Sequence, residues 1–291
     1  PSTGSWSATS SMVQARGYSP TASLLPDGKV LVVGGMFPGT STELYDPSTG
    51  MWSAGPQLPT DRAFNEAAVL QNGDVLIFGG LVGAGTGREC YRYNPTTNML
   101  SQTGDLSTYF VLPGTVVHSS GRVLVFGGGS GVATTNVEEY DPVAGSWTVL
   151  SSMNTGRLRP VVIEMPSGKI LIAGGENNSG LPIGDAELYD RSAGGASTTV
   201  SPMAYTRSWA GIARIGSQAL VFGGTSYNGS VVSYPAGAEM FNESPPSWSS
   251  ASPMATGRAQ FPAVNLANGA GVLAIGGFDG TSETSACELY R

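Results

Sequence analysis

The chain has 291 residues, a formal net charge of −7 at pH 7, and Lys29 and Lys169 as its only lysines. An acidic chain with two lysines is poorly suited to neutralising phosphates, which argues against nucleic-acid binding. No apolar run approaches the roughly 18 residues that a membrane-spanning helix needs, so we expect no membrane insertion. The 42 glycines, 19 prolines and 12% charged residues favour many short strands joined by glycine turns.

A glycine pair closes an apolar run six times along the chain. The spacing between successive pairs runs from 45 to 53 residues. A period near 50 residues is typical of a propeller blade. The pairs are Gly34-Gly35, Gly79-Gly80, Gly127-Gly128, Gly174-Gly175, Gly223-Gly224 and Gly276-Gly277.

The first copy shows the elements of one unit in chain order. A turn and an apolar strand, 26–33, precede the glycine pair, and an acidic-aromatic strand, 43–47, follows about ten residues after it. Trp52 comes next, inside a further strand. With the strand that enters the unit, each copy therefore predicts four short strands.

The double glycine, the later Tyr and the Trp at steady spacing resemble the kelch repeat, and the resemblance covers the whole chain. Leu100 and Val200 stand where two copies depart from the Trp. The resemblance implies an all-β, six-bladed propeller with four antiparallel strands in each blade. The expected blades are residues 13–57, 58–106, 107–153, 154–203, 204–254 and 255–291, with 1–12 as the outer strand of the sixth.

The two ends of the chain predict how the propeller closes. The last residues, 288–291, stop before a fourth strand, while 1–6 match 47–52 in sequence. We therefore expect the N-terminal strand to complete the C-terminal blade, which leaves no open seam between the first and last blades and limits unwanted edge pairing.

The glycine pairs themselves favour a structural interpretation. Inner strands crowd at the propeller axis, and residues without Cβ permit close backbone approach and positive φ. No copy continues as Gly-x-Gly-x-x-Gly into a helix, so a nucleotide-binding fingerprint is absent.

An arginine recurs before each innermost strand, and a glutamate recurs in the third strand. An arginine ring would suit an anion, but each glutamate precedes an arginine by 19 or 20 residues. Tyr91 replaces one glutamate, and the next arginine is replaced by Tyr109 or Phe110. Because buried charges are paired, we expect structural inter-blade ion pairs. They are Glu43–Arg62, Glu138–Arg157, Glu187–Arg207, Glu239–Arg258 and Glu288–Arg16.

Cysteine and histidine offer little for metal chemistry. Cys90 and Cys287 share one register in blades that are not neighbours, so both should be free thiols. His118 is the only histidine, and a metal centre or a catalytic triad needs several converging groups. We expect no metal and no cofactor.

One segment has a second resemblance. Residues 15–18, followed by Asp27-Gly28 and the first glycine pair, resemble the propeller of galactose oxidase and related copper-radical oxidases. That family holds copper with two histidines and two tyrosines, one of them cross-linked to a cysteine. A single histidine cannot supply this set, so the resemblance implies blade architecture without the oxidase chemistry.

The segments after each arginine and after each glycine pair emerge on the same face, where the copies differ most. Variable positions on a rigid frame usually carry function. Arg159 lacks a glutamate counterpart in the repeat, which makes it a spare cation, and Trp209 replaces smaller or different residues. The candidate ligand-binding residues are Tyr18, Phe64, Glu66, Tyr109, Arg159, Trp209, Tyr227, Phe261 and Phe278. Glu164 and Arg214 lie inside adjacent inner strands, and we expect a structural pair in preference to a catalytic acid with an electrostatic partner.

Three functions remain open. Aromatic faces with polar side chains suit a sugar or a polar peptide, which favours a binding module for a protein segment or a glycan. A sugar-processing enzyme resembling the kelch-type sialic acid mutarotase would use Glu66 or Glu176 with Arg159. The third function is a structural module of a larger bacterial surface protein. Serine, threonine and glycine content with few lysines resembles secreted bacterial kelch proteins, which implies an extracellular or cell-envelope location. We expect a monomer.

Overall fold

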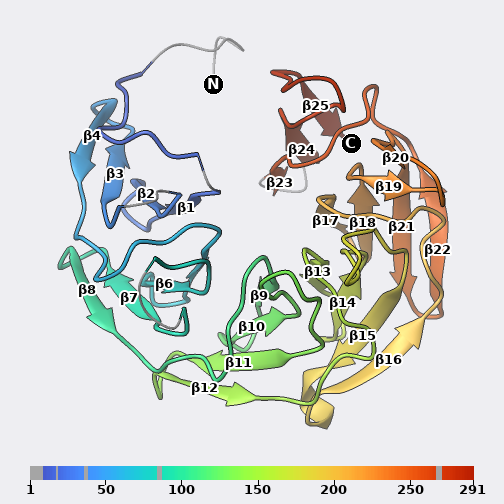
Figure 1. Cartoon of the computed structure of the whole chain (residues 1–291), viewed down its shortest axis with the longest axis horizontal. Coiled ribbons are helices and arrows are strands. Elements are labelled where there is room, and N and C mark those ends of the chain that lie inside the picture. Colours follow the sequence, from blue (N-terminus) through green and yellow to red (C-terminus); the bar gives the residue numbers. More distant parts are fainter. Residues whose placement is uncertain (1–8, 18, 36–38, 84–86, 267–270) are drawn as a thin grey trace. The chain divides into compact units, whose positions relative to one another are not determined.

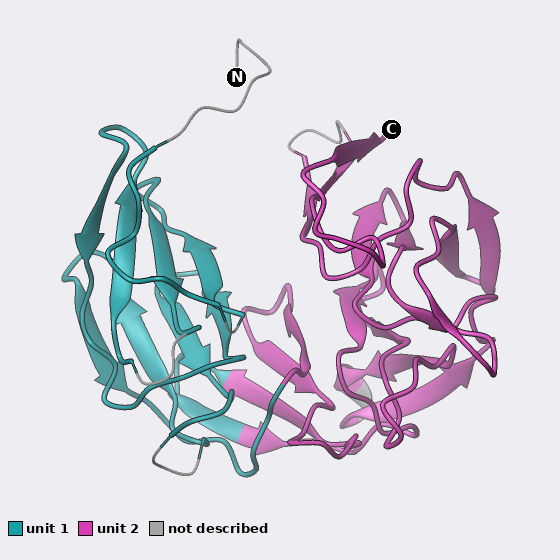
Figure 2. Ribbon diagram, turned by 45° about the horizontal axis from the view of Figure 1, so that its top comes forward, with its two compact units in different colours: residues 1–111, 141–147 teal, residues 112–140, 148–291 magenta. Residues whose placement is uncertain are grey.

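The computed structural model describes residues 9–17, 19–35, 39–83, 87–266 and 271–291. Its regular elements are strands, apart from one short 3-10 turn at Arg191–Ala193. Among these residues no helix has the length and apolar character needed to cross a bilayer. The chain divides into two compact units (Figure 2), residues 1–111 with 141–147 and residues 112–140 with 148–291.

Unit 1 contains two four-stranded antiparallel sheets, each formed by strands in sequence order (Figure 1). The first has β1 (Thr21–Leu24), β2 (Val30–Val33), β3 (Thr42–Asp46) and β4 (Met51–Ala54). The second has β5 (Glu66–Val69), β6 (Val75–Phe78), β7 (Tyr91–Asn94) and β8 (Met99–Gln102).

The other sheets lie mainly or wholly in unit 2. The third has β9 (Gly114–Val117), β10 (Val123–Phe126), β11 (Val137–Asp141) and β12 (Ser146–Val149). The fourth has β13 (Val161–Glu164), β14 (Ile170–Ala173), β15 (Ala186–Asp190) and β16 (Ala196–Val200). The fifth has β17 (Gly211–Ile215), β18 (Gln218–Phe222), β21 (Ala238–Glu243) and β22 (Pro246–Ala251). The sixth has β23 (Ala263–Asn265), β24 (Val272–Ile275) and β25 (Cys287–Tyr290), and a hairpin of β19 (Ser226–Tyr227) and β20 (Val232–Ser233) follows the fifth sheet's second strand.

These sheets confirm the expected all-β fold of six blades in a propeller arrangement. The second strand of a blade is an apolar run that is buried along its whole length, as in β6, β10 and β14. The fourth strand is mixed in composition and mostly exposed. Burying the continuous apolar runs between neighbouring sheets supplies the main stabilising term of the fold.

The packing between neighbouring blades is visible in the cores of each unit. Side chains of β10 and β14, among them Phe126 and Ile172, form one cluster with Tyr189. Phe126 meets the Tyr189 ring edge-on at a centroid distance of 5.2 Å. Similar clusters join the fourth blade to the fifth and the fifth to the sixth. In unit 1 one cluster joins the first blade to the second, and each of these four joints is therefore a layer of interdigitated apolar side chains.

The recurring Trp fastens the outer strand of a blade. Trp248 lies 5.0 Å from the ring of Phe241 on the neighbouring strand, and its Nε1 donates a 2.8 Å hydrogen bond to the main-chain oxygen of Ser201. Trp52 repeats this arrangement with Tyr45 at 5.1 Å and with the oxygen of Ser10 at 3.0 Å.

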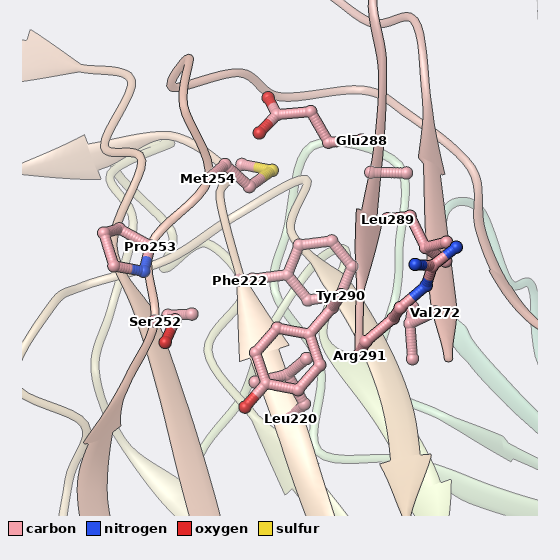
Figure 3. Close-up of a pocket in the computed structure, with 12 residues that line it drawn as sticks. Leu220, Phe222, Ser252, Pro253, Met254, Val272, Glu288, Leu289, Tyr290 and Arg291 are labelled. Atoms are coloured by element: carbon pink, nitrogen blue, oxygen red, sulfur yellow. The ribbon is translucent and has the colours of Figure 1, made fainter. Parts of the chain in front are cut away.

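The sixth blade has three described strands, and a pocket lies against the third of them (Figure 3). Ser252, Met254 and Tyr290 line this pocket. In the repeat, Ser252 and Tyr290 stand where Ser201 and Phe241 stand one blade earlier. The pocket thus has the two groups that hold a Trp in the fifth blade.

The expected fourth strand of the sixth blade falls largely on residues 1–8, which lie outside the described residues. Thr9 is the first described residue, and its Oγ1 donates a 2.9 Å hydrogen bond to the oxygen of Gly50. Thr103, directly after the outer strand β8, makes the same bond to Gly145 at 3.0 Å. Thr9 therefore occupies the position that follows an outer strand, and closure through the preceding residues stays a prediction.

The two thiols test this prediction in the intact chain. Both cysteines are free, as expected, but Cys90 is buried and Cys287 is exposed among the described residues. Burial also raises the pKa of the Cys90 thiol to about 12. Because the two residues share one register, a fourth strand should cover Cys287 as well. We expect an aromatic disulfide reagent at pH 8 to modify both thiols slowly, whereas rapid labelling of Cys287 alone would contradict closure.

Candidate functional site

The recurring arginine and glutamate pair within a blade. Arg157 Nη2 lies 2.7 Å from Glu187 Oε1, and neither side chain is exposed to solvent. Arg157 Nη1 also donates to the main-chain oxygens of Gly174 and Asp185, at 2.8 and 2.9 Å. The glutamate accepts the main-chain N–H groups of Asn154 and Thr155, at 2.7 and 3.0 Å. The pair therefore fastens the segment that enters the blade to the blade's second and third strands.

The same arrangement recurs in three other blades, so the inter-blade pairing expected from the sequence is wrong. The observed pairs are Arg16–Glu43 at 3.0 Å, Arg207–Glu239 at 3.0 Å and Arg258–Glu288 at 2.7 Å. Each arginine therefore contacts the glutamate that follows it, and not the one 19 or 20 residues before it. The physical reason is that the guanidinium extends along its own blade to the oxygen of the first glycine of the pair.

The second and third blades each lack one member of the pair. Arg62 belongs to the blade with Tyr91, and its guanidinium carbon lies 5.2 Å from the centre of that ring. It also donates to the main-chain oxygens of Gly79 and Glu89, at 3.0 and 2.7 Å. Glu138 belongs to the next blade, where buried Phe110 stands at the arginine position. The two replacements are therefore independent, and they do not mark one lost contact.

Arg159 and Trp209, the two residues that the sequence singles out, lie together in unit 2. The Arg159 guanidinium carbon lies 4.4 Å from the centre of the Trp209 ring. Arg159 Nη1 donates to Glu176 Oε2, and the hydroxyl of Ser208 donates to Glu176 Oε1 at 2.6 Å. We call these four residues the mouth cluster. Arg159 is therefore no spare cation, because Glu176 from the fourth blade's other loop pairs with it.

Main-chain bridges position the mouth cluster. Leu158 and Glu176 exchange N–H···O bonds of 2.9 and 2.7 Å, and Ser208 does the same with Thr225 at 3.0 and 2.7 Å. These bridges join the segment entering a blade to the segment after its glycine pair. The two classes of variable loop thus meet in each of these blades, as their expected common face requires.

Arg159 and Trp209 also share an uncommon backbone conformation. Their φ angles are 52° and 55°, in the left-handed region. Phe64, Leu112 and Gln260 have the same conformation, with φ of 55°, 55° and 58°. All five stand at one position of the repeat, two residues after the arginine position. Sequence comparison could not reveal this, because the five side chains have nothing in common.

In unit 2, the other candidates make contacts of their own outside the mouth cluster. Phe261 is buried and packs on Phe222 with ring centres 5.4 Å apart, so it belongs to the core and is not open to a ligand. Phe278 packs edge-on against Tyr234 at 5.5 Å, and the Tyr227 N–H donates to Thr206 Oγ1 at 2.7 Å. The remaining candidates, Phe64, Glu66 and Tyr109, belong to unit 1, while Tyr18 lies outside the described residues.

Glu66 begins the inner strand β5, and burial raises its pKa to about 8. The folded protein therefore holds this proton from the carboxyl's ordinary range up to about pH 8. Because the unfolded chain has already lost it, stability should fall as pH rises through this window. We expect Glu66→Gln to raise the melting temperature at pH 8.5 and to leave it unchanged at pH 4. An equal gain at both pH values would contradict the raised pKa.

Glu164 and Arg214 do not form the expected side-chain pair. Arg214 Nη1 reaches the main-chain oxygen of Glu164 at 3.4 Å, while the carboxylate accepts the N–H and hydroxyl of Ser119 at 2.7 and 2.6 Å. His118 Nε2 lies 3.6 Å from the same carboxylate. The group joins two blades, and within the described part of the chain no three histidine, cysteine, aspartate or glutamate side chains gather as a metal site would require.

Comparisons with known proteins bear on the repeat and on the fold. The Kelch motif family matches residues 113–154. An F-box/kelch-repeat protein of Arabidopsis thaliana is 40% identical over 94 residues, which are 30% of this chain and 18% of that protein. The match therefore spans less than a fifth of the relative's length.

Two solved structures resemble the whole fold. YjhT matches 94% of this chain and 95% of its own, with a TM-score of 0.73 and 18% identity. A fungal alcohol oxidase in complex with copper matches 89% of this chain and 58% of its own, with a TM-score of 0.70 and 19% identity. At these identities the likeness shows the fold alone, and the copper of the oxidase carries nothing over to this chain.

Proposed function

We propose that this kelch-type β-propeller is a binding module, and that its mouth cluster binds a glycan carrying a carboxylate. The observation that supports this most directly is the stacking of Arg159 on Trp209 at 4.4 Å, beside Glu176 and Ser208. A guanidinium has five N–H donors in a planar fork that suits a carboxylate. Among the described residues, Glu176 is the side chain to which Arg159 donates a hydrogen bond, and this bond uses Nη1.

The composition of the surface favours a glycan over a peptide. Phe261 lies in the core and Phe278 packs on Tyr234, whereas the half-buried Trp209 indole lies beside Arg159, which is paired with Glu176. A peptide anchors itself through apolar side chains in desolvated pockets. A sugar instead presents hydroxyls together with a C–H face that packs on an aromatic ring. The mouth cluster offers partners of the second kind.

The same contacts weigh against Glu176 as a catalytic base. Each of its oxygens already accepts a hydrogen bond, one from Arg159 and one from Ser208. A general base must reach the proton that it removes. Glu176 is thus better placed to orient Arg159 than to take a proton. An enzymatic function has its own measurement, anomer exchange of sialic acid followed by NMR, in which a rate equal to the spontaneous one excludes that activity.

An array of acidic and neutral saccharides tests the proposed function. We expect the wild-type protein to retain carboxylated saccharides and Arg159→Ala to weaken that binding about 10- to 100-fold, the loss of a charge-assisted hydrogen bond. Arg214→Ala is the matched control, because this arginine is exposed in unit 2 and lies outside the mouth cluster. Binding to neutral saccharides only, or equal binding by Arg159→Ala, would overturn the proposal, as would retention of peptides alone on a parallel peptide array.

A further inference from the structure

We infer that the left-handed position is a ligand-contacting one in unit 2, and that the site continues from Arg159 and Trp209 to Gln260, so that it accepts an acidic oligosaccharide rather than a single sugar. This inference rests on the proposed function and deepens it. Five blades have the same left-handed backbone conformation at this position, but their side chains differ.

The left-handed conformation is one that glycine adopts without strain and other residues adopt at a cost. Asparagine and aspartate are the next most tolerant. The five described residues at this position are Phe64, Leu112, Arg159, Trp209 and Gln260, and none of them is glycine, asparagine or aspartate. If only the backbone mattered, glycine would be the favoured residue. A side chain kept in spite of strain points to a use for that side chain.

Filling the core is not that use. Gln260 is exposed, and Arg159 keeps 25% of its side chain accessible. Trp209, Leu112 and Phe64 are half-buried, in contrast to Phe261, which directly follows Gln260 and lies in the core. The left-handed residue therefore directs its side chain outward, just before the strand begins. The side chain that follows it points back into the core.

Contacts between neighbours join these residues into a row in unit 2. The Arg159 N–H donates to the oxygen of Leu112 at 2.8 Å, and the Gln260 N–H donates to the oxygen of Trp209 at 3.2 Å. The guanidinium of Arg159 on the indole of Trp209 provides the link between these two pairs. The row therefore crosses four successive blades.

The side chains along the row differ in a way that suits a chain of sugar units. Arg159 is paired with Glu176 through Nη1, and its other guanidinium N–H groups can donate to a carboxylate. Trp209 offers an aromatic ring for a sugar, and Gln260 an amide that can donate to and accept from hydroxyls. A single sugar can contact the Arg159 and Trp209 side chains, which touch each other. Contact with Gln260 as well requires a ligand that extends to the next blade.

The melting temperature of a glycine variant distinguishes a position with backbone strain from one without it. We expect Gln260→Gly to raise the melting temperature by about 2–4 °C, because the substitution removes backbone strain and the side chain is exposed. Val231→Gly is the control, since Val231 is exposed but is not among the residues with positive φ. Glycine there should leave the melting temperature unchanged or lower it.

The binding readout uses an array that carries uronic- and sialic-acid saccharides of one to four units. We expect Gln260→Gly to reduce the signal from tri- and tetrasaccharides at least fivefold and to leave monosaccharides unaffected, whereas Trp209→Gly should reduce all of them. A lower melting temperature for Gln260→Gly, or an unchanged tetrasaccharide signal, would overturn the extended site. The proposed function would then still stand if Arg159→Ala loses binding, and it fails separately if the wild-type protein retains no acidic saccharide.

Discussion

Replacing Glu187 with alanine is expected to lower the free energy of unfolding by about 3–5 kcal/mol, because it leaves the Arg157 guanidinium buried without its partner. The glutamate is fully buried and also accepts two main-chain N–H groups of the entering segment. Although burial alone would raise the pKa of Glu187, hydrogen bonds from Ser197 and Asn154 and the charge of Arg157 lower it below its usual value. The carboxylate therefore contributes stability that is lost as pH falls through its folded pKa. Urea unfolding at pH 7 measures the difference.

Two comparisons make this result specific to the pair inside the blade. Glu239→Ala removes the same type of contact from the fifth blade, where Glu239 and Arg207 are both buried, so a loss of similar size is expected. A double-mutant cycle should show strong coupling between Glu187 and Arg157 and additive effects for Glu187 and Arg207. Coupling to Arg207 instead would restore the pairing between blades that the sequence suggested.

The strands and blades could be predicted because their signals are repeated. An apolar run before a glycine pair has few alternatives to a buried strand, and six copies average out local exceptions such as Leu100 and Val200. The alternation of strand direction also predicted that the two classes of variable segment emerge on one face. The bridge between Leu158 and Glu176 joins one segment of each class.

The partner of each arginine could not be predicted, because a repeat gives every residue two equivalent neighbours. Glutamates recur both 19 or 20 residues before an arginine and 27 to 32 residues after it. Spacing cannot distinguish these choices, and the direction of the guanidinium decides between them. The pairing of Arg159 with Glu176 could not be predicted for another reason. It occurs in one blade, and the described residues of the other blades show no counterpart.

The left-handed row was hidden because sequence patterns report side chains, and this feature belongs to the backbone. A run of glycines at one repeat position would have signalled positive φ. Phe64, Trp209 and Gln260 give no such signal. For the same reason Phe261 looked like a ligand contact, since the turn that reverses side-chain direction between residues 260 and 261 is not visible in the sequence.

Replacing Gly174 with alanine is expected to lower the free energy of unfolding by about 2–5 kcal/mol, the sum of backbone strain and overpacking. Its φ is +63°, and a Cβ would lie 2.4 Å from the main-chain oxygen of Arg207 in the next blade. That oxygen accepts the N–H of Gly175 at 2.7 Å, so it cannot retreat without breaking the bond that joins the blades. The close approach and the positive φ thus act together at this glycine.

Two other glycines separate the contributions. Gly180 has a φ of +70° with nothing within 4 Å of its Cβ position, so Gly180→Ala should cost about 1–2 kcal/mol from strain alone. Gly17 has open space and no positive φ, and its alanine variant should be close to neutral. Thermal and urea unfolding of the three variants gives the order. If Gly174→Ala loses no more than Gly180→Ala, close approach is not what keeps glycine there, and the pairs mark a turn conformation rather than the contact between blades.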